Sequence, residues 1–296
     1  MGIHKTPLRY PGGKQKLAPF IREILQQNGI KGHYVEPYAG GAGVAIELLL
    51  NEDVQCIHLN DSDLGIYAFW YSILNENERF CREILVASLT VEEWKKHREV
   101  VKQPQNHSLF ELGFSTFFLN RCNRSGVISA GVIGGLNQEG NYKIDARFSR
   151  NDLIRRIELI GRYKDRITVT NMDAESYINE YLPKLPANCL IYLDPPYYNK
   201  AKALYLNAYN KNDHARLAQT IQNKIRHNWV LSYDGVPQII ELYSNRRHFL
   251  YDLQYSAAKS YKGQEIFIFC DQLILPYKCS LSSINEGLER LVSFAL

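Results

Sequence analysis

The sequence has no long hydrophobic run and no strong excess of either charge. No stretch approaches the roughly 18 consecutive apolar residues that a membrane-spanning helix requires. The N-terminal residues 1–5 lack the apolar middle section of a secretory signal. We therefore expect a cytoplasmic protein without membrane contact. The 35 Lys and Arg residues against 31 Asp and Glu leave a formal net charge of +4, which by itself does not indicate nucleic acid.

Cysteine is scarce and shows no paired short spacing of the kind that binds zinc. The six cysteines stand mostly in apolar surroundings, so we expect reduced core thiols in an intracellular protein and no metal. Internal repeats and low-complexity linkers are also missing. With 296 residues and 45% hydrophobic content, the chain can hold one large catalytic core and an inserted subdomain.

The most informative stretch is residues 190–198, an apolar run typical of a buried strand that stops at an acid, two prolines and two aromatic rings. The prolines cannot continue a strand ladder and stiffen the chain where it leaves the sheet. Prolines alone would indicate an ordinary loop after a core strand. The complete motif favours a functional site. Its four residues, which we predict to be catalytic, are Asp194, Pro195, Pro196 and Tyr197.

This motif suits a planar heterocycle that carries an amino group. The carboxylate and the proline carbonyls can accept the hydrogens of the amine, while the ring stacks on Tyr197. Acceptors on both hydrogens leave electron density on nitrogen. The amine then becomes a better nucleophile toward an electrophilic methyl group.

A glycine-rich turn follows an earlier predicted strand. Residues 33–36 form that strand, residues 37–43 the turn, and residues 44–50 an apolar helix. This order is typical of the first half of a doubly wound unit, in which glycines let a ligand approach the helix start. Asp61, at the end of the next strand, can accept hydrogen bonds from both hydroxyls of a ribose. Asp63 is the weaker candidate for this role.

Residues 8–14 (LRYPGGK), residues 35–43 (VEPYAGGAG) and the motif at 194–197 resemble, in this order, the segments of Dam-type (class alpha) DNA adenine methyltransferases. The resemblance covers nearly the whole chain. It implies S-adenosylmethionine as the cofactor, with Lys14 near the carboxylate of its methionine part. It also implies that Met172 contacts the cofactor's adenine and that Asp173 lies near the adenine amine, although Asp173 equally suits a helix cap. The predicted cofactor-binding residues are Tyr10, Lys14, Glu36, Pro37, Tyr38, Gly40, Gly41, Asp61, Met172, Asp173 and Asp194.

Between the two parts of the predicted catalytic core lies a helical insertion, residues 64–150, which we interpret as the target-recognition subdomain. Its end combines basic side chains with a glycine-rich loop, a pattern that suits phosphates and base edges. Asn120, Arg121 and Gly126 resemble the family's recognition region, and beyond Gly126 the sequence departs from the pattern of the GATC-methylating branch. The resemblance therefore does not predict which DNA sequence is recognised. The predicted DNA-binding residues are Asn120, Arg121, Asn123, Arg124, Lys143 and Arg147.

The expected fold is α/β, the Rossmann-like fold of S-adenosylmethionine-dependent methyltransferases. Residues 1–63 and 151–296 form the cofactor-binding domain, with a mixed sheet closed by an antiparallel pair. The aromatic and basic loops 199–210 and 256–263 are candidates for contact with DNA.

The predicted function is methylation of the exocyclic amine of an adenine flipped out of double-stranded DNA. Alternatives are methylation of RNA or of a protein glutamine, a nucleic-acid-binding module without catalysis, and a nicotinamide oxidoreductase. The last alternative does not explain residues 194–197. A restriction endonuclease is a candidate partner, and we expect a monomer or a weak dimer.

Overall fold

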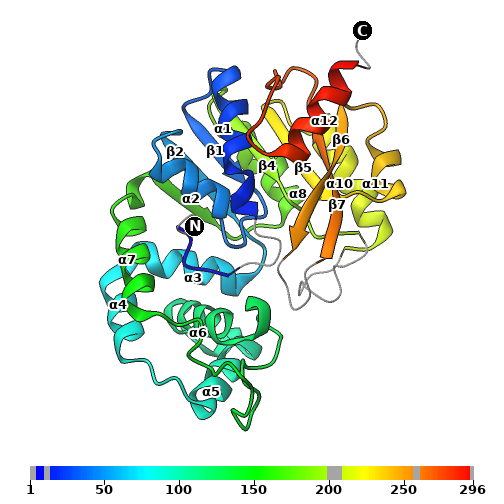
Figure 1. Ribbon diagram of the computed structural model, residues 1–296. Coiled ribbons are helices and arrows are strands. Elements are labelled where there is room, and N and C mark those ends of the chain that lie inside the picture. Colours follow the sequence, from blue (N-terminus) through cyan, green and yellow to red (C-terminus); the bar gives the residue numbers. More distant parts are fainter. Residues whose placement is uncertain (1–4, 10–13, 199–208, 256–260, 294–296) are drawn as a thin grey trace. The chain divides into compact units, whose positions relative to one another are not determined.

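The protein is described from a computed structural model that covers residues 5–9, 14–198, 209–255 and 261–293, without the side chains of 253–255, 261, 262, 292 and 293. Tyr10 and most of the predicted loops 199–210 and 256–263 lie outside the described residues. The chain divides into two compact units (Figure 1). A helical unit consists of residues 1–13 and 63–171, and a sheet unit consists of residues 14–62 and 172–296. The predicted insertion, residues 64–150, falls within the helical unit.

The sheet has seven strands in the order β3-β2-β1-β4-β5-β7-β6. β1, β2, β4 and β5 run parallel, while β7 pairs antiparallel with both β5 and β6. The predicted mixed α/β architecture with an antiparallel edge pair is therefore confirmed. The strands are β1 (His33–Glu36), β2 (Cys56–Asn60), β3 (Ile167–Thr170), β4 (Cys189–Leu193), β5 (Asn228–Asp234), β6 (His248–Tyr255) and β7 (Tyr261–Phe269).

The central strands are short and apolar because they are buried on both faces. All five residues of β4 are buried, as are the last six of β5, which is the pattern of parallel strands covered by helices. The helical elements of this unit are η1 (Lys14–Leu17), α1 (Ala18–Gln27), α2 (Gly43–Leu50), α8 (Ala174–Ser176), η5 (Tyr177–Tyr181), η6 (Leu182–Lys184), α10 (Lys211–Lys224), α11 (Pro237–Leu242) and α12 (Ser282–Ser293).

The register brings the carboxyl ends of the parallel strands to one edge of the sheet. His33, the first residue of β1, pairs with Cys56 of β2 and with Cys189 of β4. The polar residues after β1, β2 and β4 consequently leave the sheet at the same edge. In doubly wound sheets this edge is where ligands bind.

The helical unit is held together by aromatic side chains. α3 packs against α6, α4 against α7, and α5 against α6. Phe69 of α3 stacks on Phe117 of α6 with ring centroids 5.8 Å apart, and Phe80 of α4 contacts the same ring edge-on. The helical elements are α3 (Leu64–Asn75), α4 (Asn77–Val86), α5 (Val91–Lys102), η2 (Pro104–Asn106), α6 (Leu109–Cys122), η3 (Arg124–Gly126), α7 (Arg150–Gly161) and η4 (Lys164–Arg166). Among the described residues, no helix combines the length and apolar character needed to cross a bilayer.

Asn60, the last residue of β2, ties together the chain segments at the ligand-binding edge. Its side-chain nitrogen donates to the carbonyls of Pro37 (3.1 Å) and Met172 (3.0 Å), and its side-chain oxygen accepts from the amide of Met172 (3.0 Å). The residue is 1% exposed. Asn60 thus provides side-chain partners for three backbone groups, of which the carbonyl of Pro37 is buried and the two groups of Met172 are partly buried.

We predict that Asn60→Ala lowers the free energy of unfolding by about 2–4 kcal/mol, because unpaired buried polar groups cost about 1–3 kcal/mol each. Denaturant unfolding followed by circular dichroism measures this loss. The matched control is Asn223→Ala, at an exposed position of α10, which should change stability by less than about 0.5 kcal/mol. Equal stability of the two variants would contradict the role given to Asn60.

Candidate active site

Asp194 begins the loop that follows β4, at the ligand-binding edge of the sheet. Its Oδ1 atom accepts a hydrogen bond from Ser232 Oγ of β5 at 2.9 Å and lies 3.2 Å from Lys14 Nζ. Both contacts involve Oδ1. Within the described part of the chain, Oδ2 has no hydrogen-bond partner, and the side chain is 22% exposed. One oxygen thus holds the carboxylate in place, and the other is available to a ligand.

Glu265 of β7 connects the residues around Asp194. It is fully buried. It receives hydrogen bonds from Lys14 Nζ (2.6 Å), from the hydroxyl of Tyr197 (2.5 Å) and from the hydroxyl of Tyr251. Asp234 pairs with Glu265 across the antiparallel strands β5 and β7, so Glu265 reaches the edge at which Asp194 leaves β4. A buried carboxylate with several donors is held rigidly.

The charges of this cluster are coupled. Burial raises the pKa of Asp194, and Lys14 partly opposes that rise. Burial alone would raise the pKa of Glu265 too, but Lys14 and the tyrosine hydroxyls outweigh it and lower the pKa. Burial would lower the pKa of Lys14, yet Asp194 and Glu265 together raise it. Lys14 is therefore protonated and Glu265 ionised at neutral pH, and with Asp194 ionised the cluster carries a net charge of −1.

The aromatic end of the 194–197 motif is fastened to neighbouring strands. Tyr197 is only 4% exposed, and Lys14 Nζ lies 5.5 Å from the centroid of its ring. The amide of Tyr198 donates to Asp234 at the end of β5 (2.9 Å). These contacts add to the stiffness of the two prolines. The motif is thus a fixed structure at its aromatic end.

The glycine-rich turn after β1 lies beside Asp61. The amide of Gly40 donates to Asp61 Oδ2 at 2.8 Å, and Gly40 adopts a φ of +46°, which suits a residue without a side chain. Glu36 ends β1 and accepts from the amide of Ala45 (3.0 Å) in the first turn of α2. Burial raises the pKa of Glu36 to about 8. Glu36 therefore braces the turn from inside.

The other predicted cofactor residues occupy the same edge. Pro37 and Met172 are joined through Asn60, and the hydroxyl of Tyr38 lies 3.2 Å from that of Tyr209. Gly41 lies in the turn itself. Asp173 caps α8 by accepting from the amides of residues 175 and 176. Its contact with a cofactor stays a prediction, as do the other cofactor contacts. Asp63, the weaker ribose candidate, caps α3.

Three of the predicted DNA-binding side chains are buried inside the helical unit. The side-chain oxygen of Asn120 accepts a hydrogen bond from the amide of Arg9. Its side-chain nitrogen donates to the carbonyls of Arg9 and Gly126. Arg121 donates to the carbonyl of Arg147 at 2.7 Å, and burial together with other guanidinium groups lowers its pKa to about 9. Asn123 donates to the carbonyls of residues 127 and 128. In this structure the three side chains brace the loop that follows α6.

The remaining three predicted DNA-binding residues, Arg124, Lys143 and Arg147, are exposed. Lys143 and Arg147 belong to residues 127–147, which we call the recognition arm. Arg124 lies immediately before it. Contact of these residues with DNA stays a prediction.

Sequence reasoning missed Ser232 and Glu265. Ser232 stands between apolar residues in β5, and Glu265 begins the apolar half of β7. A polar residue among the buried residues of a strand can indicate a functional position. Neither Ser232 nor Glu265, however, belongs to a short sequence motif. Lys14, which contacts both residues, is predicted from the sequence to bind the carboxylate of the cofactor. Its ammonium lies against Glu265 and Asp194 in this structure.

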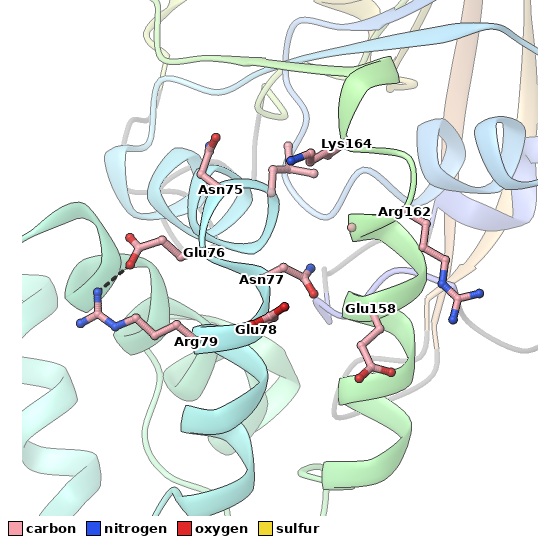
Figure 2. Close-up of a pocket in the computed structure, with 10 residues that line it drawn as sticks. Asn75, Glu76, Asn77, Glu78, Arg79, Glu158, Arg162 and Lys164 are labelled. Carbon is pink, nitrogen blue, oxygen red and sulfur yellow. Dashed lines mark hydrogen bonds and ion pairs between the residues drawn. The ribbon is translucent and has the colours of Figure 1, made fainter.

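A cavity of about 530 Å³ lies in the helical unit, at the junction of α3 and α4 and the end of α7. Figure 2 shows its charged and amide side chains, including the ion pair of Arg79 with Glu76. Charges of both signs line it, among them Glu158 and Lys164. No predicted site residue lines this cavity, and we assign it no function.

Comparison with known proteins adds independent findings. The model of the D12 class N6 adenine-specific DNA methyltransferase family matches residues 10–257. The Type II methyltransferase M.MjaIII of Methanocaldococcus jannaschii is 24% identical over 223 residues, which are 71% of this chain and 74% of that protein.

Two solved structures are similar at low identity. PH1948 of Pyrococcus horikoshii has a TM-score of 0.42 and 10% identity, covering 90% of this chain and 88% of that chain. The rRNA methyltransferase AviRa of Streptomyces viridochromogenes has a TM-score of 0.38 and 10% identity, covering 88% and 86% of the two chains. Scores below 0.5 carry no conclusion about substrate.

We predict that Lys14→Met lowers the free energy of unfolding at neutral pH by about 3 kcal/mol, because it leaves buried carboxylates without their cation. The control is Lys16→Met, at an exposed position of the same short helix. The pKa of Glu265 is lowered from 4.5. Its stabilising pairing is therefore present above about pH 4.5 and lost as the pH falls through the lowered value.

The stability difference between wild type and Lys14→Met should accordingly shrink in acid. Urea unfolding at several pH values measures it. A Lys14→Met protein as stable as Lys16→Met at neutral pH would show that the ion cluster does not stabilise the sheet unit.

Proposed function

Because the chain belongs to the D12 class N6 adenine-specific DNA methyltransferase family, we propose that it transfers a methyl group from S-adenosylmethionine to the exocyclic amine of an adenine flipped out of double-stranded DNA. The observation that carries this proposal is the arrangement at Asp194. A carboxylate held by Ser232 and Lys14 through one oxygen presents the other at the ligand-binding edge.

The residues of the motif act on the amine of the base. Oδ2 of Asp194 and the carbonyl of Pro195 accept its two hydrogens, which fixes the direction of the nitrogen lone pair. Because Oδ1 is held from β5 and from η1, the acceptor cannot turn away when the base binds. Holding two reactants in an aligned geometry can remove several kcal/mol of the barrier.

Tyr197 provides the aromatic surface for the base. Stacking on an aromatic side chain contributes about 1–3 kcal/mol per base. The hydrogen bond from its hydroxyl to Glu265 fixes the position of the far end of the ring. That binding energy offsets part of the few kcal/mol needed to unpair and unstack the adenine.

The donors and acceptors at the sheet edge fit S-adenosylmethionine. Asp61 lies beside the glycine turn, where a carboxylate can accept from ribose hydroxyls. Met172 offers a polarisable apolar surface for adenine. The net negative cluster of Asp194, Lys14 and Glu265 suits a positively charged sulfonium. When bound, the cofactor supplies an activated methyl group for direct displacement.

We propose further that the chain belongs to the Dam-type (class alpha) branch. The order of its segments supports this assignment, with residues 8–14 first, the glycine turn second and the 194–197 motif last. Cytoplasmic location, a restriction endonuclease as partner and a monomeric or weakly dimeric state stay predictions.

We predict that purified protein with S-adenosylmethionine methylates adenine in one recurring short sequence of unmethylated genomic DNA, as detected by single-molecule sequencing. Asp194→Ala should lower the rate at least a hundredfold, roughly the effect of removing one preorganised group that stabilises the transition state. Binding of the cofactor, measured by calorimetry, should be largely retained.

The matched control is Asp252→Ala, at an exposed position of β6, which should leave methylation unchanged. An Asp194→Ala enzyme with unaltered turnover would remove the central claim. Cofactor binding without any DNA methylation would redirect the search to RNA or protein substrates.

We predict that Glu265→Gln shifts the acidic limb of the methylation rate to lower pH. Methylation requires ionised Asp194, whose pKa is raised by burial, with Lys14 opposing the rise and Glu265 adding to it. A neutral glutamine removes one negative charge near Asp194. It also leaves Asp194 as the only carboxylate of the cluster that pairs with Lys14. Both changes lower the pKa of Asp194.

Rates with saturating DNA and cofactor, measured from about pH 4 to about pH 8, report this limb. Tyr251→Phe is the control, since it removes a hydrogen bond to Glu265 but keeps the charge. A Glu265→Gln profile that coincides with the wild-type profile, or that shifts to higher pH, would contradict this action of Glu265 on Asp194.

A further inference from the structure

We propose that His214 of α10 is a positioning residue, which holds the loop after β4 and the glycine turn after β1 at a fixed separation. This inference rests on the proposed function, because it presupposes that the loop binds the amine and that the turn binds the methyl donor. It names a side chain that acts on both sites through neighbouring tyrosines.

The imidazole of His214 is enclosed by tyrosine rings. The residue is 2% exposed. Its ring centroid lies 4.8 Å from that of Tyr198, 5.6 Å from that of Tyr209 and 5.7 Å from that of Tyr233. Its Nδ1 atom lies 2.6 Å from the hydroxyl of Tyr233, within hydrogen-bond distance. The bond and the three rings together restrict the imidazole to one orientation.

The loop after β4 is held on both faces of the sheet. Tyr233 pairs with the residue that follows Glu265, and successive side chains of a strand alternate, so Tyr233 and Glu265 lie on opposite faces. Tyr197 binds Glu265 on one face. The ring of Tyr198 packs against His214 on the face of Tyr233. Two successive residues of the loop are thus fastened from opposite sides, which restricts its tilting.

Tyr209 connects His214 with the glycine turn. Its ring meets the imidazole edge-on, at an interplanar angle of 63°. Its hydroxyl lies 3.2 Å from that of Tyr38, which belongs to the turn. Asn210, next to Tyr209, caps α10 by accepting hydrogen bonds from two amides of the first turn. The cap fixes Tyr209 relative to His214, so one imidazole contacts both the loop after β4 and the partner of the glycine turn.

The second nitrogen of His214 indicates that the residue does not serve stability alone. Burial lowers the pKa of the imidazole, and Asp234 and Asp213 oppose this change only in part, so the ring is neutral at neutral pH. In the described ranges of the chain, Nε2 has no hydrogen-bond partner. An unpaired buried polar atom lowers stability, and an apolar side chain would fill the space without that cost. Residues that reduce stability in this way are typical of functional sites.

The test compares His214→Leu with Ile221→Ala. The leucine is apolar and removes both the flat ring and the hydrogen bond to Tyr233. Ile221 is fully buried in the same helix, so its truncation weakens the packing of α10 but leaves His214 in place. The substrate is a synthetic duplex that carries the recognition sequence found by sequencing. The measured quantities are the single-turnover methylation rate, the dissociation constants of cofactor and DNA, and the melting temperature.

We expect His214→Leu to lower the single-turnover rate at least about tenfold, because a small misplacement of reacting groups has a large effect on rate. The two dissociation constants should change less than about twofold, since the lost interaction aligns the reactants and does not bind them. His214→Phe, which keeps a flat ring, should recover most of the rate. Ile221→Ala should lower the melting temperature more than His214→Leu does and keep the wild-type rate.

Hydrogen–deuterium exchange followed by mass spectrometry gives a measure that does not depend on catalysis. The amide of Tyr198 donates to Asp234, and the amide of Gly40 in the glycine turn donates to Asp61. In His214→Leu the segments that contain these two amides should exchange faster than in the wild type. Ile221→Ala should leave both segments unchanged.

A wild-type rate for His214→Leu would overturn the inference and leave the proposed function standing. An equal loss of rate in Ile221→Ala would also overturn it, because the effect would then come from the packing of α10. A loss of affinity in place of rate would assign His214 to binding and contradict its positioning role. If the wild-type protein methylated no DNA, the proposed function would fail, while the exchange experiment would still report whether His214 fixes the two segments.

Discussion

The buried ion cluster of Lys14, Asp194 and Glu265 is the interaction on which the sheet unit of this protein depends. Its members come from the helix η1, the end of β4 and the strand β7, so the cluster forms only when the sheet is complete. Removing one charge from such a group leaves the others buried without compensation. The same cluster shifts the pKa of Asp194 and holds the hydroxyl of Tyr197, so it links the stability of the sheet unit to the proposed site.

The cluster also contributes to the fixed geometry of the loop that begins at Asp194. Asp194 is held through one carboxylate oxygen, Tyr197 through its hydroxyl and Tyr198 through its amide. The two prolines between them limit the remaining backbone freedom. Preorganisation of this kind lowers the cost of aligning an amine with a methyl donor.

The helical unit uses buried amides in the way that the sheet unit uses buried charges. Asn123 donates to the carbonyls of residues 127 and 128, the half-buried Gln138 donates to those of residues 133 and 135, and Asn120 donates to the carbonyl of Gly126. A loop rich in glycine would otherwise sample many conformations. With its backbone fixed from inside, the arm can expose its basic side chains without losing shape. Buried polar side chains here determine which other side chains are exposed.

The sequence by itself determined the features that depend on neighbouring residues. The strand before Asp194, the proline-stiffened motif, the glycine turn and the alternation of strands with helices all follow from local periodicity and backbone geometry. These features were enough to predict amine methylation and the edge of the sheet at which we propose it. Only the tertiary structure decided which distant residues these side chains contact. Lys14 meets Glu265 across 251 residues of chain because β7 pairs with β5 in one register. Asn120 and Asn123 are buried because neighbouring segments cover α6 from Leu112 to Cys122 without an exposed stripe, which the sequence of α6 alone does not reveal.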